Sequence, residues 1–237
     1  MSGESRSDGN VLYLTSGGSV TSQVCDHVRH DILNGSLAPG LKLKIEALRD
    51  MYGAGASPLR EALSLLTSEG LVERLDQRGF RVAGVSAAGF DELLKTRCWV
   101  EEKAIRESLA QGDQAWEESI VLAHHRLKRT PRTPNAPASE NADWEAAHKH
   151  FHLSLISACG SSLLLAFCER LYDFNIRYRN IAGQTRTGPA STGRSVSDEH
   201  EGIFNAAIAR DADKAVELLL SHYRHTGEEL SRALAVV

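Results

Sequence analysis

The sequence predicts a mostly α-helical protein in two parts, a small N-terminal domain of helices with a β-hairpin and a larger all-helical C-terminal domain. Apolar residues recur at helical spacing along most of the 237-residue chain, and strand-like segments are confined to 71–75 and 80–82. Aromatic residues make up only 6% of the chain, which suits helices packed through small side chains. Hydrophobic residues at 42% and charged residues at 24% are ordinary globular proportions and argue against general disorder.

The N-terminal domain, residues 18–84, follows a small and polar segment, residues 1–17, which we expect to be disordered. Its apolar residues recur at helical spacing in three segments, each of which is followed by a glycine. These segments are 20–34, 45–52 and 57–69. The third begins with Ser57 as a candidate N-cap and Pro58 in the first helical position.

A β-hairpin is predicted after the third helix, with strands over 71–75 and 80–82 and a turn over 76–79. Three helices followed by a hairpin form the outline of a winged helix-turn-helix. In such a domain the third helix enters the major groove of DNA and the hairpin touches the backbone or the minor groove. From periodicity alone, a small helical domain with a hairpin and no DNA-binding role is an equal alternative.

From residue 87 onward, every segment has helical periodicity and none alternates like a strand. A proline-rich loop over 130–141 and a loop rich in Gly, Ser and Thr over 183–197 separate the helices. The region 87–237 is therefore expected to be an all-α bundle of about six helices. The expected helices are 87–111, 113–129, 142–158, 161–182, 197–210 and 212–235.

Charge limits how this protein can bind nucleic acid. The chain has 27 basic and 31 acidic residues, a net charge of −4, which argues against binding by bulk charge. The N-terminal domain holds equal numbers of basic and acidic residues, so any DNA contact depends on a few well-placed side chains.

The N-terminus does not resemble a signal peptide, and no apolar run is long enough to span a bilayer. The four cysteines form no CxxC pair. We expect a soluble, cytoplasmic protein with reduced thiols and no membrane partner.

The segment LAPGLKLKIEALRDMYGAGASPLREALSLLTSEGLVERLDQRGFRV resembles the DNA-binding domain of GntR-type bacterial transcription regulators. The resemblance covers about residues 20–84. Its specific parts are the LxPG turn at 37–40, PLREAL at 58–63, EGLV at 69–72 and the Arg78-Gly79 pair at the wing. It implies a winged helix-turn-helix that binds a double-stranded DNA operator.

The predicted DNA-contacting residues are basic, or lie where the backbone can approach closely. They are Lys44, Arg49, Ser57, Arg60, Arg78 and Gly79, with Lys42 as a further candidate. Arg60, expected on the first turn of the third helix, can hydrogen-bond a guanine edge or a phosphate, and Ser57 with the free N–H groups beside it favours phosphate. Each charge could instead be an ordinary solvated one. The chain departs from the family at Ala56, where an arginine that reads a base is common, and at Glu46, where a basic residue is common, so a known operator does not transfer.

Four of the ten histidines are expected to face inward in the helical domain. His148 and His152 are four residues apart on the apolar face of the helix over 142–158, so both imidazoles lie on one side. His200 and His222 stand on the apolar stripes of two later helices. Four inward imidazoles suggest a shared divalent-metal site, with zinc as the first candidate and nickel, cobalt or manganese as alternatives. A hydrogen-bonded core histidine is the commoner explanation of any single one.

The C-terminal region, over about 90–235, resembles the FCD ligand-binding domain of FadR-subgroup GntR regulators. The resemblance rests on Arg97, Glu101, Phe151-His152, Glu199-His200, Asp211 and His222. It implies that one acidic residue and three histidines hold a metal that helps to bind a carboxylate effector. Here His148 occupies the position of the usual aspartate, so the implied set is four histidines. The segments WEESIVLAHHRL, FHLSLISACGS and RLYDFNIRYR look closest to the carbon-starvation-induced regulator branch, which implies a small dicarboxylate effector.

Arg97 and Arg177 are the residues expected to bind the effector carboxylate, because a planar guanidinium can bind it through two hydrogen bonds. Arg179 is the weaker candidate. Each arginine could instead form an ion pair in the interior or at a dimer interface.

The remaining histidines of the helical domain are assigned to the surface or to the outer hydrogen bonds of the site. They are His124, His125, His150 and His225.

Together these patterns predict a homodimeric, ligand-responsive transcription regulator without enzymatic activity. Repression is the first candidate for its regulatory outcome. One rival is a metal-dependent hydrolase or oxygenase in a helical bundle. The sequence has no HExxH motif, Glu199 is the nearest candidate base, and four protein ligands leave less room for an activated water. A second rival is a metal-storing or metal-sensing protein in which the metal itself is the signal.

Overall fold

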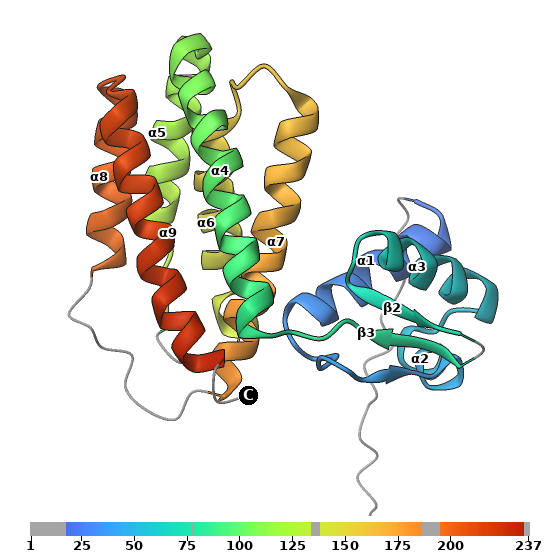
Figure 1. Cartoon of the computed structure of the whole chain (residues 1–237). Helices are drawn as coiled ribbons and strands as arrows, with labels where there is room; N and C mark the ends of the chain where they lie inside the picture. The colour runs from blue at the N-terminus through green and yellow to red at the C-terminus, as the bar shows by residue number, and fades with distance from the viewer. Residues whose placement is uncertain (1–17, 77, 134–137, 186–194, 235–237) are drawn as a thin grey trace, which may run out of the picture. The chain divides into compact units, whose positions relative to one another are not determined.

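The computed structural model describes residues 18–76, 78–133, 138–185 and 195–234, so the disorder expected for residues 1–17 lies outside the described residues. The chain divides into two compact units, residues 1–84 and 85–237. Figure 1 shows the helices and strands of each unit.

The N-terminal unit consists of three helices and a small antiparallel sheet. Its elements are α1 (Val20–Leu33), β1 (Lys42–Leu43), α2 (Ile45–Tyr52), α3 (Ala56–Ser68), β2 (Val72–Leu75) and β3 (Gly79–Val82). Strand β3 lies between β1 and β2 and pairs antiparallel with both. The predicted hairpin is therefore confirmed as β2 and β3. Strand β1 is an addition, because two residues are too few to give a visible alternation.

The core of the N-terminal unit comes from one face of each helix. The residues of α1 and α3 that are fully buried are Val24, Val28, Ile32, Leu59, Ala62, Leu63 and Leu66. Burying a side chain of this size stabilises the fold by roughly 1.5–3 kcal/mol. Helix α2 ends where predicted, because Gly53 has φ of 62°, a left-handed conformation that glycine adopts without strain.

Helix α3 begins two residues earlier than the sequence suggests. Gly55 is its N-cap, Ala56 its first residue, and Ser57 and Pro58 occupy the second and third positions. The expected Ser57 cap is therefore wrong, as is the placement of Arg60 on the first turn. Proline fits the third position as well as the first, since the first four N–H groups of a helix have no intrahelical partner. Gly55 offers no side-chain cap, so this helix start keeps open N–H donors.

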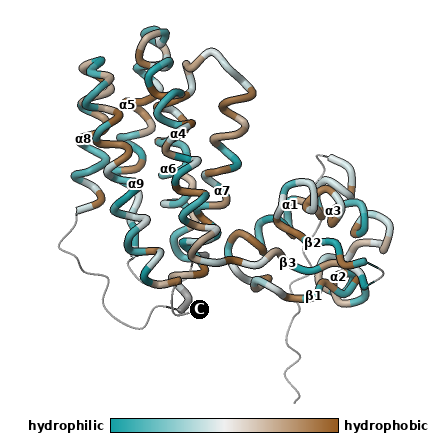
Figure 2. Tube along the Cα trace, viewed as in Figure 1, coloured by the Kyte–Doolittle hydropathy of each residue, from teal (hydrophilic) through white to brown (hydrophobic). Residues whose placement is uncertain are grey.

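The C-terminal unit is the expected all-α bundle. Its helices are α4 (Ala87–Gln111), α5 (Gln114–Arg129), α6 (Ala142–Ile156), α7 (Ser162–Thr185), α8 (Val196–Ile208) and α9 (Ala212–Leu234), with a short 3₁₀ helix, η1 (Ala138–Asn141), before α6. In Figure 1, α4 lies beside α9 and α7, and α8 lies beside α9. Figure 2 shows hydrophobic and hydrophilic residues alternating along each helix, as expected when one face is buried.

The helix ends differ from the prediction by up to three residues. The largest difference is in α7, which continues to Thr185 instead of ending at 182. Helices α4 and α9 pack closely, because an added Cβ at Gly227 would lie 2.4 Å from the Leu94 side chain. Among the described residues, no helix is both long enough and apolar enough to cross a membrane.

Candidate functional sites

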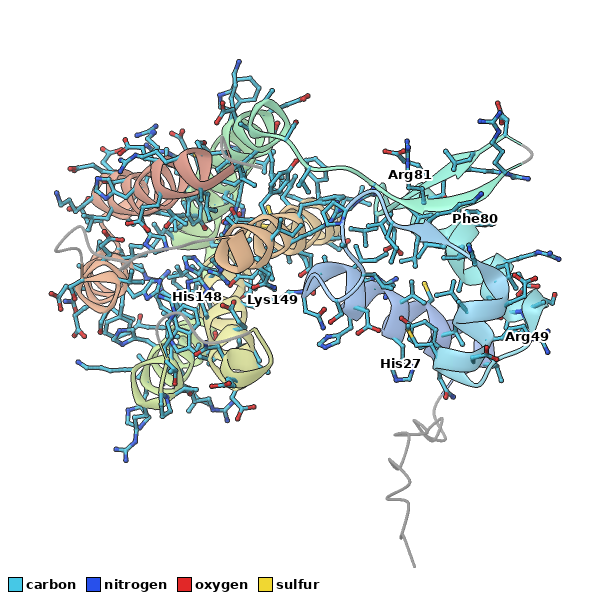
Figure 3. All side chains as sticks on the ribbon, turned by 90° about the horizontal axis from the view of Figure 1, so that it is seen from below. His27, Arg49, Phe80, Arg81, His148 and Lys149 are labelled. Atoms are coloured by element: carbon cyan, nitrogen blue, oxygen red, sulfur yellow. The ribbon has the colours of Figure 1, made fainter. Side chains whose placement is uncertain are left out.

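Four buried histidines converge in the centre of the helical unit, and they are called the four-histidine cluster below. They are His148 and His152 on α6, His200 on α8 and His222 on α9. One ring nitrogen of each lies within 4.8 Å of those of the other three. The Nε2 atom of His148 lies 3.1 Å from Nε2 of both His152 and His200. Figure 3 shows His148 pointing into the space between the helices.

Hydrogen bonds from outside the cluster orient three of these rings. Nδ1 of His148 lies 2.5 Å from the Tyr172 hydroxyl, and Nδ1 of His152 lies 3.2 Å from the hydroxyl of Tyr223. Nδ1 of His222 lies 2.7 Å from a carboxylate oxygen of Glu199. When Nδ1–H donates to these oxygens, the Nε2 lone pair stays available for a cation.

The donor set fits a divalent transition metal. Burial, and then the neighbouring histidines, hold the pKa of His148 and of His152 well below the usual range, so both rings are neutral at pH 7. Neutral imidazole is the form that binds metal. Two nitrogens of a tetrahedral zinc site, each ~2.05 Å from the ion, are about 3.3 Å apart. The observed separations of 3.1 Å are close to that value.

Next to the cluster lies a buried ion pair between Arg97 and Glu101 on α4. Nε of Arg97 donates to Glu101 Oε1 at 2.5 Å, and the Tyr223 hydroxyl donates to the other oxygen of the same carboxylate. The Arg97 guanidinium carbon lies 3.9 Å from the centre of the Tyr223 ring. Arg97 is only 3% exposed, and its Nη2 has no hydrogen-bond partner among the described residues. A ligand carboxylate can satisfy such a buried donor.

On α7, the geometry favours Arg179 over Arg177 as the second arginine near the cluster. Arg179 is seven residues after Tyr172 and lies on the same face of the helix. It hydrogen-bonds Glu145 and Tyr172, and its charge acts on both histidines of α6. The Nε atom of Arg179 is buried, but so is that of Arg177, so burial of this atom does not separate the two arginines. Arg177 is buried as well, but a shift of five residues rotates it roughly 140° around the helix from Tyr172.

The remaining histidines of the helical unit are not all at the surface. His125, His150 and His225 are exposed, as expected. His124 is buried, and its ring stacks on Phe204 with centroids 4.2 Å apart. Burial lowers its pKa, so it is a core histidine. Its helical spacing from Trp116 and Ile120, eight and four residues earlier on the buried face of α5, is the signal that could have placed it in the core.

Several side chains of the site were missed by sequence reasoning. Tyr172 and Tyr223 hold the outer hydrogen bonds described above, and Trp144 stacks on His148 with centroids 4.6 Å apart and planes 15° from parallel. Glu199, expected from the sequence as a candidate base and as part of the Glu199-His200 pair, forms a hydrogen bond with His222. Helical spacing places Tyr172 and Tyr223 near the histidines, but an aromatic residue on an apolar face ordinarily indicates packing alone.

All predicted DNA-contacting residues lie on the surface of the N-terminal unit. They are Lys44, Arg49, Ser57, Arg60, Arg78 and Gly79. None of the ion pairs among the described residues involves the four cations of this set, whereas Arg29 is paired with Glu69 and Arg81 with Glu73. Figure 3 shows Arg49 on the outside of this unit. These cations, together with the open N–H groups at the start of α3, can bind phosphate.

A helix-turn-helix with a β-wing, joined to an all-α unit with a buried polar centre, defines the class of two-domain transcription regulators. Residues 20–82 match the model of bacterial regulatory proteins of the gntR family, and residues 92–225 match the FCD domain. The chain therefore belongs to the GntR family of DNA-binding transcriptional regulators, in the group with an FCD domain.

Relatives along nearly the whole chain agree with this assignment. BphR of Paraburkholderia xenovorans LB400, an uncharacterized HTH-type transcriptional regulator, is 37% identical over 220 residues, covering 92% of this chain and 88% of that protein. The HTH-type transcriptional repressor GlaR of Escherichia coli K12 is 32% identical over 197 residues, covering 82% and 88%. The solved structure of E. coli McbR/YncC has the same fold, with a TM-score of 0.73, 20% identity and coverage of 91% and 99%. These relatives are regulators, in agreement with the expectation that this chain is not an enzyme.

Proposed function

We propose that this regulator binds a pseudo-palindromic operator as a homodimer. We further propose that a small carboxylate, bound at a metal site in the FCD domain, changes the affinity for that operator. A dicarboxylate is the first candidate for the effector, and repression is the first candidate for the regulatory outcome. The observation that carries the proposal is the convergence of the four-histidine cluster, whose ligand atoms lie within 4.8 Å of one another, beside the unpartnered Nη2 of Arg97.

The metal would be held by His148, His152, His200 and His222. A bound divalent ion supplies a positive charge and a Lewis acid for a carboxylate oxygen. The protein's own groups would bind and orient the rest of the anion. Arg97 is held in place by Glu101, which leaves its Nη2 free to donate to the effector, and Arg179 adds a second positive charge from α7.

Zinc is the first candidate for the metal because it accepts an all-nitrogen, neutral ligand set. Four histidines fill a tetrahedral ion, so an effector carboxylate would rely mainly on Arg97 and Arg179. An octahedral nickel or cobalt ion would keep two positions open for the carboxylate. The fully protein-ligated arrangement also favours a second candidate function, a metal sensor in which ion binding itself is the signal.

The N-terminal unit would read the operator through α3 and the wing. Arg60 would contact a base edge, and the remaining cations would contact phosphates. Two copies of the chain would contact two half-sites in a palindromic operator, since a symmetric pair of helix-turn-helix units is matched to such a sequence. The effector would then shift the equilibrium between arrangements of the two units that fit, or do not fit, the half-site spacing.

Equilibrium binding to the operator of a regulated promoter tests this proposal. The full chain, without a histidine tag, is titrated onto labelled DNA with and without a series of dicarboxylates, before and after metal removal by a chelator. The proposal expects a dicarboxylate-dependent change in affinity that disappears after chelation. A change caused by chelation alone, insensitive to any dicarboxylate, would support the metal sensor instead. Affinity at the non-specific level under all conditions would contradict both.

A further inference from the structure

We propose that Glu101 is a positioning residue for the metal centre, and that it acts on His152 through the hydroxyl of Tyr223. This role rests on the metal centre of the proposed function. The chain of contacts begins at Arg97 and Glu101 on α4, continues to Tyr223 on α9 and ends at His152 on α6. Helices α4 and α9, which carry its first three members, lie side by side (Figure 1).

Every contact of this chain is buried and joins two defined atoms. Nε of Arg97 donates to Glu101 Oε1 at 2.5 Å, and Oε2 of the same carboxylate accepts from the Tyr223 hydroxyl. The oxygen of that hydroxyl lies 3.2 Å from Nδ1 of His152. Each of the four residues is at most 3% exposed, so bulk water does not compete for these hydrogen bonds.

The donors and acceptors of the chain fix its direction. An arginine can only donate, and a carboxylate paired with it can only accept. The carboxylate is both the closer and the charged acceptor of the single Tyr223 hydrogen, which leaves the Tyr223 oxygen to accept from His152. A neutral imidazole has one N–H, and this bond places it on Nδ1. Nε2 of His152, which lies 3.1 Å from Nε2 of His148, therefore keeps its lone pair.

This direction prepares His152 to bind a cation, because the lone pair on Nε2 is available without a change of tautomer. The carboxylate that fixes it is also bonded to Arg97, whose Nη2 has no hydrogen-bond partner among the described residues. Glu101 thus connects a proposed metal ligand to the arginine that the proposed function assigns to the effector.

The variant Glu101→Gln tests the direction because it reverses the chain. Arg97 still needs an acceptor, so the amide oxygen of the new side chain faces Nε of Arg97 and the NH₂ group faces Tyr223. That NH₂ group donates to the Tyr223 oxygen, and the hydroxyl then donates to Nδ1 of His152. The hydrogen of His152 is thereby placed on Nε2, the atom that would bind the metal. Tyr223→Phe, by contrast, breaks the chain without reversing it.

The first measurement is the affinity of the full-length, tag-free, metal-free protein for Zn²⁺, obtained by competition with a chromophoric chelator, with circular dichroism as the check on folding. Tyr223→Phe should weaken the affinity on the order of tenfold, and Glu101→Gln on the order of 100-fold. The double variant should bind about tenfold more tightly than Glu101→Gln, because the reversed bond no longer reaches His152. Glu102→Gln is the control and should bind as the wild type, since Glu102 pairs with Arg106 instead.

A second measurement uses the metal-free wild type and does not depend on whether Glu101→Gln folds. The ¹⁵N NMR signals of the His152 ring are identified by their loss in His152→Ala. They should show the hydrogen of His152 on Nδ1, and this preference should weaken in Tyr223→Phe.

Wild-type affinity in Glu101→Gln would overturn the inference. Additive losses in the double variant would also overturn it, since Glu101 would then act through its charge and not through Tyr223. So would a hydrogen on Nε2 of His152 in the metal-free wild type. A wild-type protein that takes up no Zn²⁺, Ni²⁺ or Co²⁺ would instead refute the metal centre itself, so the two failures are distinguishable.

Discussion

The hydroxyl of Tyr172 on α7 lies 2.5 Å from Nδ1 of His148 on α6, one of the four cluster histidines. This contact directs the other ring nitrogen, Nε2, toward the cluster. The pair thus links a proposed metal ligand on α6 to a neighbouring helix, and its removal gives the first prediction.

Tyr172→Phe should weaken metal binding by roughly 10- to 100-fold, the usual effect of removing an outer hydrogen bond from a ligating histidine. The hydrocarbon packing of the ring is kept, so the fold should remain intact. Competition with a chelator of known affinity measures the change. Tyr178→Phe on the same helix is the control, because Tyr178 packs on Phe90 in a different part of the core. Equal affinity in Tyr172→Phe and the wild type would contradict the assigned role.

His152→Ala should abolish the response of operator binding to the effector while leaving operator affinity itself unchanged. The reason is that His152 belongs to the compact unit 85–237, whereas the DNA-binding surface belongs to the unit 1–84. Fluorescence anisotropy of a labelled operator, with and without the effector, measures both quantities. An effector response that survives intact in this variant would show that the site lies elsewhere.

Glu101→Leu should destabilise the protein by about 3–5 kcal/mol, because it leaves the buried Arg97 charge without its partner. The double variant Arg97→Met with Glu101→Leu should recover much of that loss, since an apolar pair of similar volume can replace a buried ion pair. Urea unfolding followed by circular dichroism measures the free energies. If the double variant were no more stable than Glu101→Leu, the ion pair would not be the cause of the loss.

Arg60→Ala and Lys44→Ala should weaken operator binding in different ways. Loss of a base-reading arginine should reduce the operator-binding free energy by about 1–3 kcal/mol and relax specificity at one base position. Loss of a phosphate-binding lysine should weaken binding to all sequences alike and reduce the slope of log affinity against log salt concentration by about one. Binding isotherms on operator and random DNA at several salt concentrations separate the two. Arg81→Ala is the matched control, because Arg81 is paired with Glu73. Identical behaviour of Arg60→Ala and Arg81→Ala would contradict the assignment of Arg60.

The thiols should be unreactive in the folded protein. All four cysteines are buried, and burial raises the pKa of the Cys168 thiol to about 12. At pH 8 this group therefore holds its proton, and the reactive thiolate is scarce. A chromogenic disulfide reagent should label four thiols per chain in denaturant and almost none without it. Rapid labelling of the native protein would show that the helical unit opens readily.

Most of the fold could be predicted from the sequence because its helices are amphipathic and bounded by strong end signals. Gly53, for example, stops α2 at the predicted residue. The start of α3 was predicted less accurately than the end of α2, since Ser57 and Pro58 are acceptable both at the helix boundary and two positions inside it. The two-residue strand β1 carries no periodic signal and depends on pairing with β3.

The candidate metal centre could be predicted in its ligands but not in its surroundings. The i, i+4 spacing of His148 and His152 fixes their common face, and the apolar stripes of later helices bring in the other two histidines. The partners of Nδ1 could not be predicted, because Tyr172 and Tyr223 look like ordinary core residues in the sequence. The choice between Arg177 and Arg179 depends on the rotation of α7 against α6, which only the packed structure defines.

The metal content of the purified, tag-free protein decides whether the four-histidine cluster binds a metal ion. Elemental analysis of the wild type and of His152→Ala, grown and purified side by side, gives the number of ions per chain. The four-histidine cluster predicts about one divalent transition-metal ion per chain in the wild type, with zinc as the first candidate, and a loss of most of it in the variant. A wild-type protein without metal, which also takes up none when Zn²⁺, Ni²⁺ or Co²⁺ is added, would contradict the account.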